Sequence, residues 1–343
     1  MGLSDLPPWM EPVSITRVER AHRAVGCRNS GGAVVVTQPL PVNTDEIQSL
    51  TVQQAEALAH RESYLSLGGL TMLSGEVARA LAQHAGWSLS LNGLASLSDE
   101  AAAALSRHKG ITLGLDGLTS LSDEQAISLA QRRGILCLNR LTSLSVAAAQ
   151  AFATNTQALC LNGVMSLSDD AITSLAQLRG AIFLNTLTAL SNRAAKALAQ
   201  HEGHLFLDGL TSLSTEAAQA LAQHNGDLSL NGLTTLSGEQ AEVFAQHKCS
   251  LYLGGLTTLS GSAAKALAPH TGALFLDGVT KLSDDAVKAI AQHKGKLRFH
   301  RLSLSDEAAK VLETHPDVVV PWQICLPPHL VGKFLARQAE RGQ

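Results

Sequence analysis

Aromatic residues are scarce in this chain. Only 3% of its residues are Phe, Trp or Tyr, although 45% are hydrophobic. Leu and Ala must therefore build the core, which suits a thin, repeated core better than one compact core. Neither sign of charge dominates, because 26 basic residues stand against 29 acidic ones. This balance argues against bulk attraction to nucleic acid or to an anionic membrane, so we expect neither as a partner.

The sequence also lacks a disulfide framework and a membrane-spanning run. Its cysteines form no CxxC pair and no compact, even set: Cys27, Cys137, Cys160, Cys249 and Cys325. Reduced thiols are the expected state. No run of about 18 apolar residues is present. The segment MGLSDLPPWMEPVSITRVER has no basic start followed by an apolar core, so it does not read as a signal peptide, and we expect a cytoplasmic protein.

The chain does contain an internal repeat. A Leu or Val just after the turn recurs with two initial spacings of 24 residues and later spacings of 23. These positions are Leu70, Leu94, Leu118, Leu141, Val164, Leu187, Leu210, Leu233, Leu256, Val279 and Leu302. They predict eleven repeats over residues 64–315. A weaker unit without the strand motif predicts a capping helix within 44–63.

The two ends of the chain are interpreted as caps. Residues 1–43 form an N-terminal extension or cap, in which Val34–Val36 is a candidate strand. Residues 316–343 form a C-terminal cap, with a candidate strand at Val318–Val320 and a candidate basic helix over 329–341. Solenoids need such caps because their terminal repeats expose the core.

Each repeat reads as a strand, a turn and a helix. Leu89–Leu91 alternates apolar and small residues, which predicts a short strand with one buried face. Ser98 is a helix N-cap, and Ala102 with Leu105 forms a buried helical stripe. A glycine after the helix is expected to stop it in the left-handed conformation: Gly110, Gly203, Gly226, Gly272 and Gly295.

The repeat determines the fold class. Strands that return to the same place stack in parallel about 4.8 Å apart, whereas helices need about 10 Å. The array must therefore curve. The prediction is an α/β solenoid with a parallel sheet on the concave face and helices on the convex face.

The segment LSLNGLASLSDEAAAALSRH (89–108) resembles the leucine-rich-repeat family. Its closest match is the cysteine-containing subtype of F-box repeat proteins, LxLxGCxxITDxGLxxLAxxC. Leu94 replaces the first cysteine of that pattern, and His108 lies near the second. The resemblance covers roughly 250 residues of the array. Residues 1–43 do not resemble an F-box, so no ubiquitin-ligase role is implied.

One repeat position, in the last helical turn, carries a series of histidines. They are His84, His108, His201, His224, His247, His270 and His293. One interpretation is a ladder of metal ligands. The other is that each imidazole meets carbonyl groups at the end of its own or a neighbouring helix. The second is favoured, because one residue per repeat does not supply converging ligands, and no metal or other cofactor is expected.

Ser and His within one repeat do not predict a hydrolase. Ser74 and His84 are separated by about 15 Å along a helix, whereas a nucleophile and its base lie about 3 Å apart. There is also no GxSxG motif. We therefore expect that the protein is not an enzyme and has no catalytic residues.

Two further columns are candidates for a binding site. Asn or Asp ends most strands, and either ties the turn or forms a polar rail for a ligand: Asn92, Asp116, Asn139, Asn162, Asn185, Asp208, Asn231 and Asp277. Between the strand leucines, the residue pointing away from the core is aromatic in four of five consecutive repeats: Phe183, Phe206, Tyr252 and Phe275.

These aromatic residues either stabilise the sheet by stacking or form a contact surface. The favoured hypothesis is a partly exposed concave strip flanked by Asn185, Asp208, Asn231 and Asp277. The predicted function is a non-enzymatic scaffold that binds a protein or peptide. The alternatives are a structural or regulatory solenoid that acts through its helices or termini, and a carbohydrate-binding module.

Overall fold

The computed structural model describes residues 43–154, 157–313, 315 and 318–319, all within one compact unit of residues 40–343. Strand and helix alternate along this unit, and every strand pairs with its predecessor in parallel. The strands are β1 (Leu65–Ser66), β2 (Ser88–Ser90), β3 (Thr112–Gly114), β4 (Ile135–Cys137), β5 (Ala158–Cys160), β6 (Ala181–Phe183), β7 (Leu205–Phe206), β8 (Leu228–Ser229), β9 (Leu251–Tyr252), β10 (Leu274–Phe275), β11 (Leu297–Arg298) and β12 (Val318–Val319).

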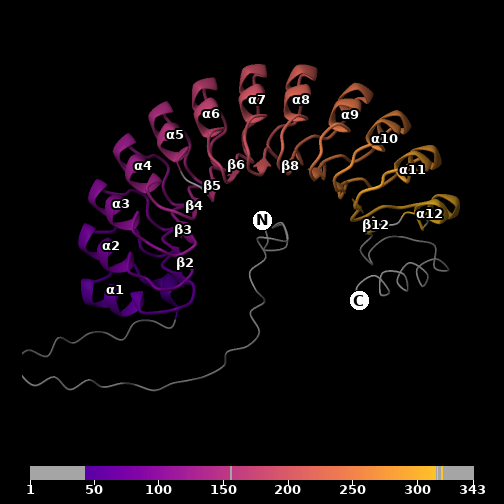
Figure 1. Ribbon diagram of the computed structural model, residues 1–343. Coiled ribbons are helices and arrows are strands. Elements are labelled where there is room, and N and C mark those ends of the chain that lie inside the picture. The colour runs from indigo at the N-terminus through magenta and orange to yellow at the C-terminus, as the bar shows by residue number, and fades with distance from the viewer. Residues whose placement is uncertain (1–42, 155–156, 314, 316–317, 320–343) are drawn as a thin grey trace, which may run out of the picture. The chain divides into compact units, whose positions relative to one another are not determined.

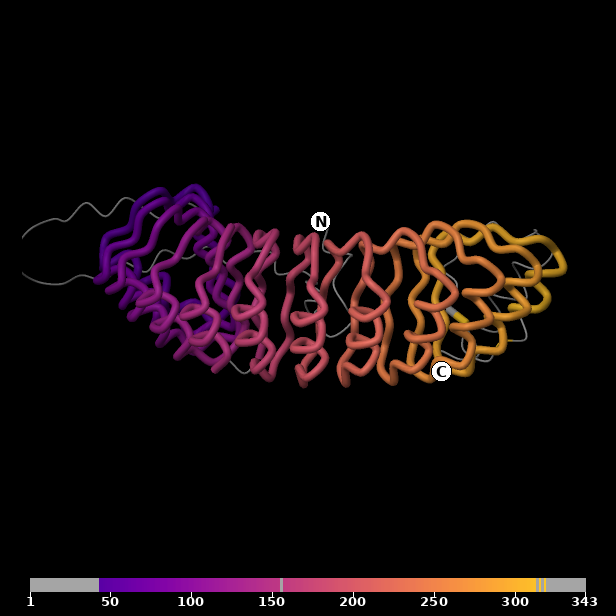
Figure 2. The backbone as a smooth tube through the Cα atoms, turned by 90° about the horizontal axis from the view of Figure 1, so that it is seen from above, coloured from indigo at the N-terminus to yellow at the C-terminus, as the bar shows by residue number. Residues whose placement is uncertain are grey.

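The helices are short and follow the strands. They are α1 (Val52–Ala59), α2 (Gly75–Leu81), α3 (Asp99–Leu105), α4 (Asp123–Ala130), α5 (Val146–Phe152), α6 (Asp169–Leu175), α7 (Asn192–Leu198), α8 (Thr215–Leu221), α9 (Gly238–Phe244), α10 (Gly261–Leu267), α11 (Asp284–Ile290) and α12 (Asp306–Glu313). A 3-10 turn, η2 (Thr44–Glu46), precedes α1. The repeats form an arc with the strands inside and the helices outside (Figure 1), and seen from above the successive turns of chain lie side by side (Figure 2).

This arrangement confirms the predicted fold class, an α/β solenoid of the leucine-rich-repeat type. Strands β1 to β11 are each followed by a helix, and β12 adds a twelfth strand at Val318–Val319, inside the predicted Val318–Val320. The segment before the first repeat forms η2 and α1. The candidate strand at Val34–Val36 and the candidate helix over 329–341 lie outside the described residues.

A Leu and Ala core runs the length of the array. The two strand leucines and the turn leucine are almost completely buried, as in Leu89, Leu91 and Leu94. Ala102 and Leu105 meet them from α3 with no exposed surface. Burying each large side chain contributes about 1.5–3 kcal/mol, and the small alanines let helix and sheet approach closely.

Serine hydroxyls begin the helices as expected. The side chain of Ser98 accepts a hydrogen bond from the amide of Ala101, three residues into the turn. The same bond recurs at the N-caps of α2 to α11, including Ser74 and Ser283. Each cap satisfies one of the amide donors that a helix N-terminus leaves open.

The role assigned to the glycines after the helices was wrong. Among the described glycines, only Gly134 has a positive φ, of 126°. A Cβ at Gly203 would instead lie 2.0 Å from the carbonyl oxygen of Gly180 in the preceding repeat. Gly110, Gly226, Gly272 and Gly295 face the same kind of contact. These glycines are required because neighbouring repeats approach closely, not because the backbone is left-handed.

Candidate functional site

The four aromatic side chains of the concave column lie on β6, β7, β9 and β10, and parallel pairing brings them together in two pairs. The rings of Phe183 and Phe206 stack with their centroids 4.3 Å apart. Those of Tyr252 and Phe275 stack at 4.2 Å. Ser229 separates the two pairs, since β8 lies between β7 and β9.

The expected exposure of this strip was wrong for its phenylalanines. Phe183, Phe206 and Phe275 are only 6%, 7% and 6% exposed, whereas Tyr252 is half-buried. Alternation along a strand determines on which side of the sheet a ring lies. It does not reveal that in-register rings on neighbouring strands cover one another's faces. Burial also raises the pKa of the Tyr252 hydroxyl.

Arg298, on β11, extends the aromatic column. Its guanidinium lies 4.4 Å from the ring centre of Phe275 and forms an ion pair with Asp277. The Nε atom of Arg298 donates to both carboxylate oxygens of Asp277, at 3.0 and 3.1 Å. Arg298 occupies the same strand position as Phe275, but its cation–π stacking depends on the ring on the neighbouring strand, which the sequence position alone does not show.

The Asn/Asp column ties each repeat to the next. The side-chain oxygen of Asn185 accepts a hydrogen bond from the amide of Asp208 at 3.3 Å, and the carboxylate of Asp208 accepts from the amide of Asn231 at 3.0 Å. The same bond joins Asn92 to the amide of Asp116 and Asn231 to the amide of Gly254. These oxygens are therefore engaged in the scaffold, although Asn185, Asp208, Asn231 and Asp277 all remain half-buried beside the aromatic column.

Cys137 and Cys160 occupy the same concave column on β4 and β5. Their sulfur atoms lie 3.8 Å apart, and both thiols are free, as is Cys249. The hydrogen bond between the two thiols, together with burial, raises the pKa of Cys160. Free thiols are what the sequence predicted for this pair. Cys27 and Cys325 lie outside the described residues.

The histidine column forms a buried stack of imidazoles, which we call the histidine ladder. Its members are at most 2% exposed: His84, His108, His201, His224, His247, His270, His293 and His315. Neighbouring ring centroids are 5.8–6.3 Å apart in the six stacked pairs. This spacing lies between the widths of a strand and a helix, as expected in the turn that joins them.

The helix-end interpretation of these histidines holds in part. His201 Nδ1 lies 3.3 Å from the carbonyl oxygen of Ala176, the C-cap of the preceding helix α6. His270 Nδ1 instead meets the carbonyl of Gly272 at 3.1 Å. Burial, together with the neighbouring imidazoles of His201 and His247, lowers the pKa of His224 to about 4. An imidazole with this pKa is neutral at pH 7.

Rings stacked in parallel in this way do not converge on one point. A zinc ion needs three or four ligands that converge on it at about 2.0–2.1 Å for nitrogen. Within the described part of the chain, no group of three or more His, Cys, Asp or Glu side chains is arranged to hold a metal.

Among the described residues, two others stand in the histidine column between His108 and His201. Leu178, 1% exposed, stands in the histidine column. Arg132 also stands there, is 1% exposed, and donates from Nη2 to the carbonyl oxygen of Gly110 at 2.7 Å. Burial lowers the pKa of Arg132 to about 10. Both were missed in the sequence, although Arg132 follows His108 by the 24-residue spacing.

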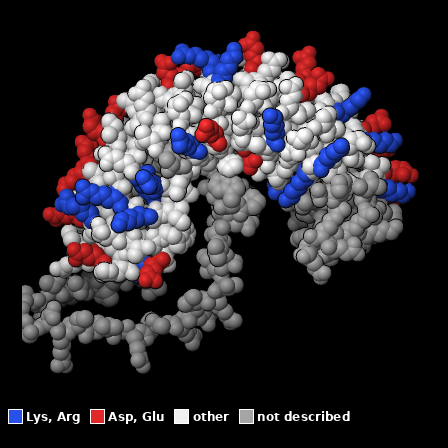
Figure 3. Space-filling view, viewed as in Figure 1, with Lys and Arg blue, Asp and Glu red and all other residues white. Residues whose placement is uncertain are grey.

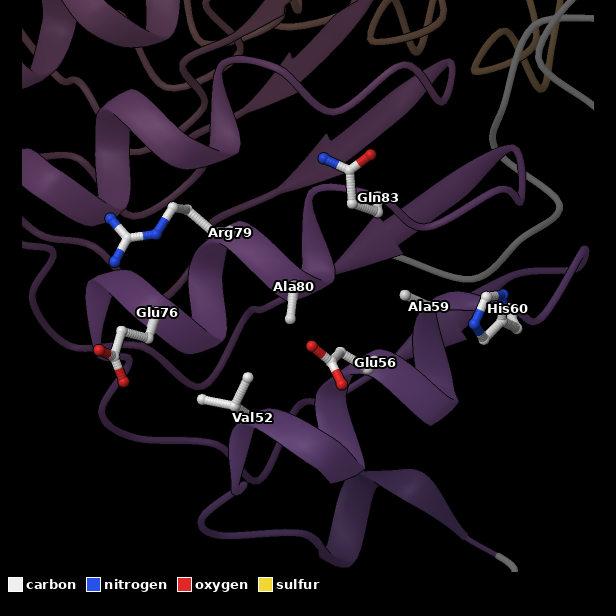
Figure 4. Close-up of a pocket in the computed structure, with 8 residues that line it drawn as sticks. All are labelled: Val52, Glu56, Ala59, His60, Glu76, Arg79, Ala80 and Gln83. Carbon is white, nitrogen blue, oxygen red and sulfur yellow. The ribbon is translucent and has the colours of Figure 1, made fainter.

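A hollow between α1 and α2 holds several charged side chains (Figure 4). The carboxylates of Glu56 and Glu76 lie at separate points of this hollow rather than facing each other. Arg79 pairs with Glu100 of the next helix at 2.6 Å. Without converging groups the hollow offers no acid–base pair. In the same repeat, Ser74 and His84 lie beyond opposite ends of α2.

Comparison with known proteins adds to the description of the fold only. No family model matches this sequence, and no curated protein matches it. Among solved structures, it is similar to an internalin from Listeria monocytogenes, with 15% identity and a TM-score of 0.47 over 80% of this chain and 76% of the internalin. It is also similar to a leucine-rich-repeat protein of Leptospira interrogans, with 14% identity and a TM-score of 0.41 over 86% and 92% of the two chains.

A third similar structure is that of the Toll–Spatzle complex of Drosophila. The identity is 11% and the TM-score 0.47, over 72% of this chain and 38% of that one. At these identities and scores, no function is carried over from the three structures. Among the described residues, no helix has the length and apolarity needed to cross a membrane.

Proposed function

We propose that this chain is a non-enzymatic scaffold that binds a protein or peptide along the concave side of its sheet. The observation that carries the proposal is the concentration of aromatic side chains. The chain has nine Phe and Tyr residues, and four of them occupy one column on the side of the sheet away from the Leu core. On strands β2 and β3 the same column holds small residues instead, Ser90 and Gly114.

The accessible part of this surface lies at β9 to β11. Tyr252 is half-buried, and the side chains of Arg298 and Asp277 are 34% and 29% exposed. Tyr and Arg are among the residue types enriched at the energetic centres of protein interfaces. We therefore place the main contact at Tyr252 and Arg298, with Phe183, Phe206 and Phe275 supporting it and Asn185, Asp208, Asn231 and Asp277 flanking it.

A display selection of peptides against the full chain tests the proposal. Binders are expected to lose at least tenfold in affinity, about 1.4 kcal/mol, when Tyr252→Ser and Arg298→Ser are combined. Met165→Ser is the matched control, because Met165 is 64% exposed and lies outside the column. If the selected peptides instead lose affinity only on substitutions in the helices, the concave proposal is wrong.

A further inference from the structure

The first two full repeats carry one residue more than the later ones, and the structure shows where it sits. Five positions separate His84 from Leu89, whereas four separate His201 from Leu205. The additional residues are Trp87 and Ile111, between the glycine and the strand. Trp87 accepts a hydrogen bond from the amide of Thr112 at 3.1 Å, and Ile111 accepts from that of Ile135 at 2.7 Å. The two residues therefore lie where adjacent strands begin.

The insertion places large apolar side chains in solvent. Trp87 is 49% exposed and Ile111 is 55% exposed. Tyr64, which is 47% exposed, contacts Trp87 with ring centroids 5.8 Å apart. We call these three residues the edge cluster. Since later repeats close the same turn without the extra residue, the fold itself does not require it, and clustered exposed apolar side chains usually mark a contact surface.

Basic residues lie close in sequence to the edge cluster. The segments that join helix to strand in this region carry exposed Arg61, Arg107, Lys109 and Arg133, against one acidic residue, Glu62. Figure 3 shows Lys and Arg side chains gathered over the repeats of α2 to α4. A partner for this surface needs negative charge, because basic groups attract acidic partners and repel basic ones.

We propose that the edge cluster is a second docking surface and that its occupant is an acidic peptide segment with a large apolar side chain. The apolar side chain packs against Trp87 and Ile111, and the acidic groups on either side meet Lys109 and Arg133. This surface is separate from the concave column of Tyr252, so the two proposed contacts can be tested independently.

Fluorescence anisotropy of the full chain with two labelled peptide pools tests this. One pool has Phe or Leu between Asp and Glu residues, and the other has the same centre between Lys residues. We expect the acidic pool to bind at least tenfold more tightly. Trp87→Ser combined with Ile111→Ser is expected to weaken that binding at least tenfold while the melting temperature stays unchanged. Ile127→Ser is the matched control, since Ile127 is 51% exposed on α4.

Charge-reversal variants and alternative binding partners complete the test. Lys109→Glu with Arg133→Glu is expected to weaken binding of the acidic pool and to reduce its salt dependence. Tyr252→Ser with Arg298→Ser is expected to leave it unchanged, which distinguishes this surface from the concave one. Equal binding of the two pools, or binding unaffected by Trp87→Ser, overturns the proposal. Binding to phosphatidylserine vesicles without binding to the acidic pool, or self-association that depends on Trp87, overturns it in favour of a lipid surface or a second copy.

Discussion

The N-terminal and C-terminal parts of the array use their few aromatic side chains in opposite ways. In β1 to β3 the concave column is small, with Ser66, Ser90 and Gly114, and the aromatic residues Tyr64 and Trp87 lie exposed at the edge of the sheet. In β6 to β10 the aromatic residues lie in the concave column instead. One backbone repeat thus supports two different surfaces.

The edge of the sheet shows the same contrast. Where the N-terminal repeats carry the edge cluster, the later repeats join one another by polar contacts. The amide of Asp227 donates to His204 Nδ1 at 3.3 Å, and the amide of Ser250 donates to the carboxylate of Asp227 at 3.0 Å. Polar links of this kind stabilise the array itself, whereas an exposed Trp contributes little to folding. At this edge, therefore, the later repeats are joined by polar links, whereas the first repeats expose apolar side chains.

The largest expected effect is a loss of folding stability at low pH. Six consecutive rings of the histidine ladder, from His201 to His315, lie in the C-terminal part, but only His84 and His108 lie in the N-terminal part. Burial lowers the pKa of His224 and His270 from 6.5 to about 4. The unfolded chain therefore binds more protons, and stability is lost as the pH falls from 6.5 towards 4. For one such ring the loss at pH 4 is on the order of 3 kcal/mol.

Hydrogen exchange at pH 7 and at pH 4.5 measures this difference between the two parts. We expect residues 201–313 to lose protection in acid before residues 65–130, because repeat arrays open locally. His224→Leu with His247→Leu is expected to move the acid transition to lower pH, since Leu178 fills the same column when buried. His60→Gln, at an exposed position, is the control. Equal acid sensitivity of the two parts would contradict the prediction.

Adding a Cβ to a glycine between repeats is expected to destabilise the fold less than acid does, and by the same amount in both parts. An added Cβ would lie 1.9 Å from the carbonyl oxygen of Ser63 at Gly86 and 2.0 Å from that of Gly180 at Gly203. Gly86→Ala and Gly203→Ala should each destabilise the fold by about 2 kcal/mol or more, because backbone must move. Gly261→Ala, where a Cβ meets nothing within 4 Å, should change stability by less than about 1 kcal/mol. Urea unfolding of the three variants checks this.

Side chains of the Asn/Asp column are expected to stabilise the fold more towards the C-terminus. The carboxylate of Asp208 accepts from both the amide of Asn231 and the hydroxyl of Ser229, whereas Asn92 accepts from the amide of Asp116. Asp208→Ala should cost about 1–2 kcal/mol, and Asn92→Ala less. Asp208→Asn keeps an acceptor and is expected to retain most of the stability. A larger loss from Asn92→Ala, measured by thermal melting, would reverse this order.

The sequence was sufficient to predict the fold, because its repeat period alone makes each strand stack on the previous strand and each helix on the previous helix. Ser98 and its equivalents could be identified because an N-cap depends on local sequence. The glycines were misread, since a left-handed turn and a close backbone contact both exclude a Cβ and leave the same residue in the sequence. The contacts of Gly203 with Gly180 depend on a neighbouring repeat, which local reasoning does not include.

The candidate sites were predicted less well for a related reason. The sequence shows that the four aromatic residues share one repeat position, but the burial of Phe183 depends on its stacking with Phe206, 23 residues away. Trp87 and Ile111 left a clear signal, the two spacings of 24 residues, but the signal marks only an insertion. Whether an inserted residue faces the core or the solvent depends on the turn in which it lies.

The smallest expected effect compares one ion pair from each part. Arg79 and Glu100, between α2 and α3, are 51% and 60% exposed. Arg298 and Asp277 are 34% and 29% exposed, and Arg298 also stacks on Phe275. Water and salt screen the first pair, so its coupling in a double-mutant cycle should be below about 0.5 kcal/mol. The second pair is less screened and is held in place by the ring, so its coupling should be about 1 kcal/mol.

Raising the salt concentration should reduce the first coupling more than the second, because exposed charges are screened more strongly. Equal couplings, or a larger one for Arg79 and Glu100, would show that the concave column does not order Arg298 as its contacts indicate.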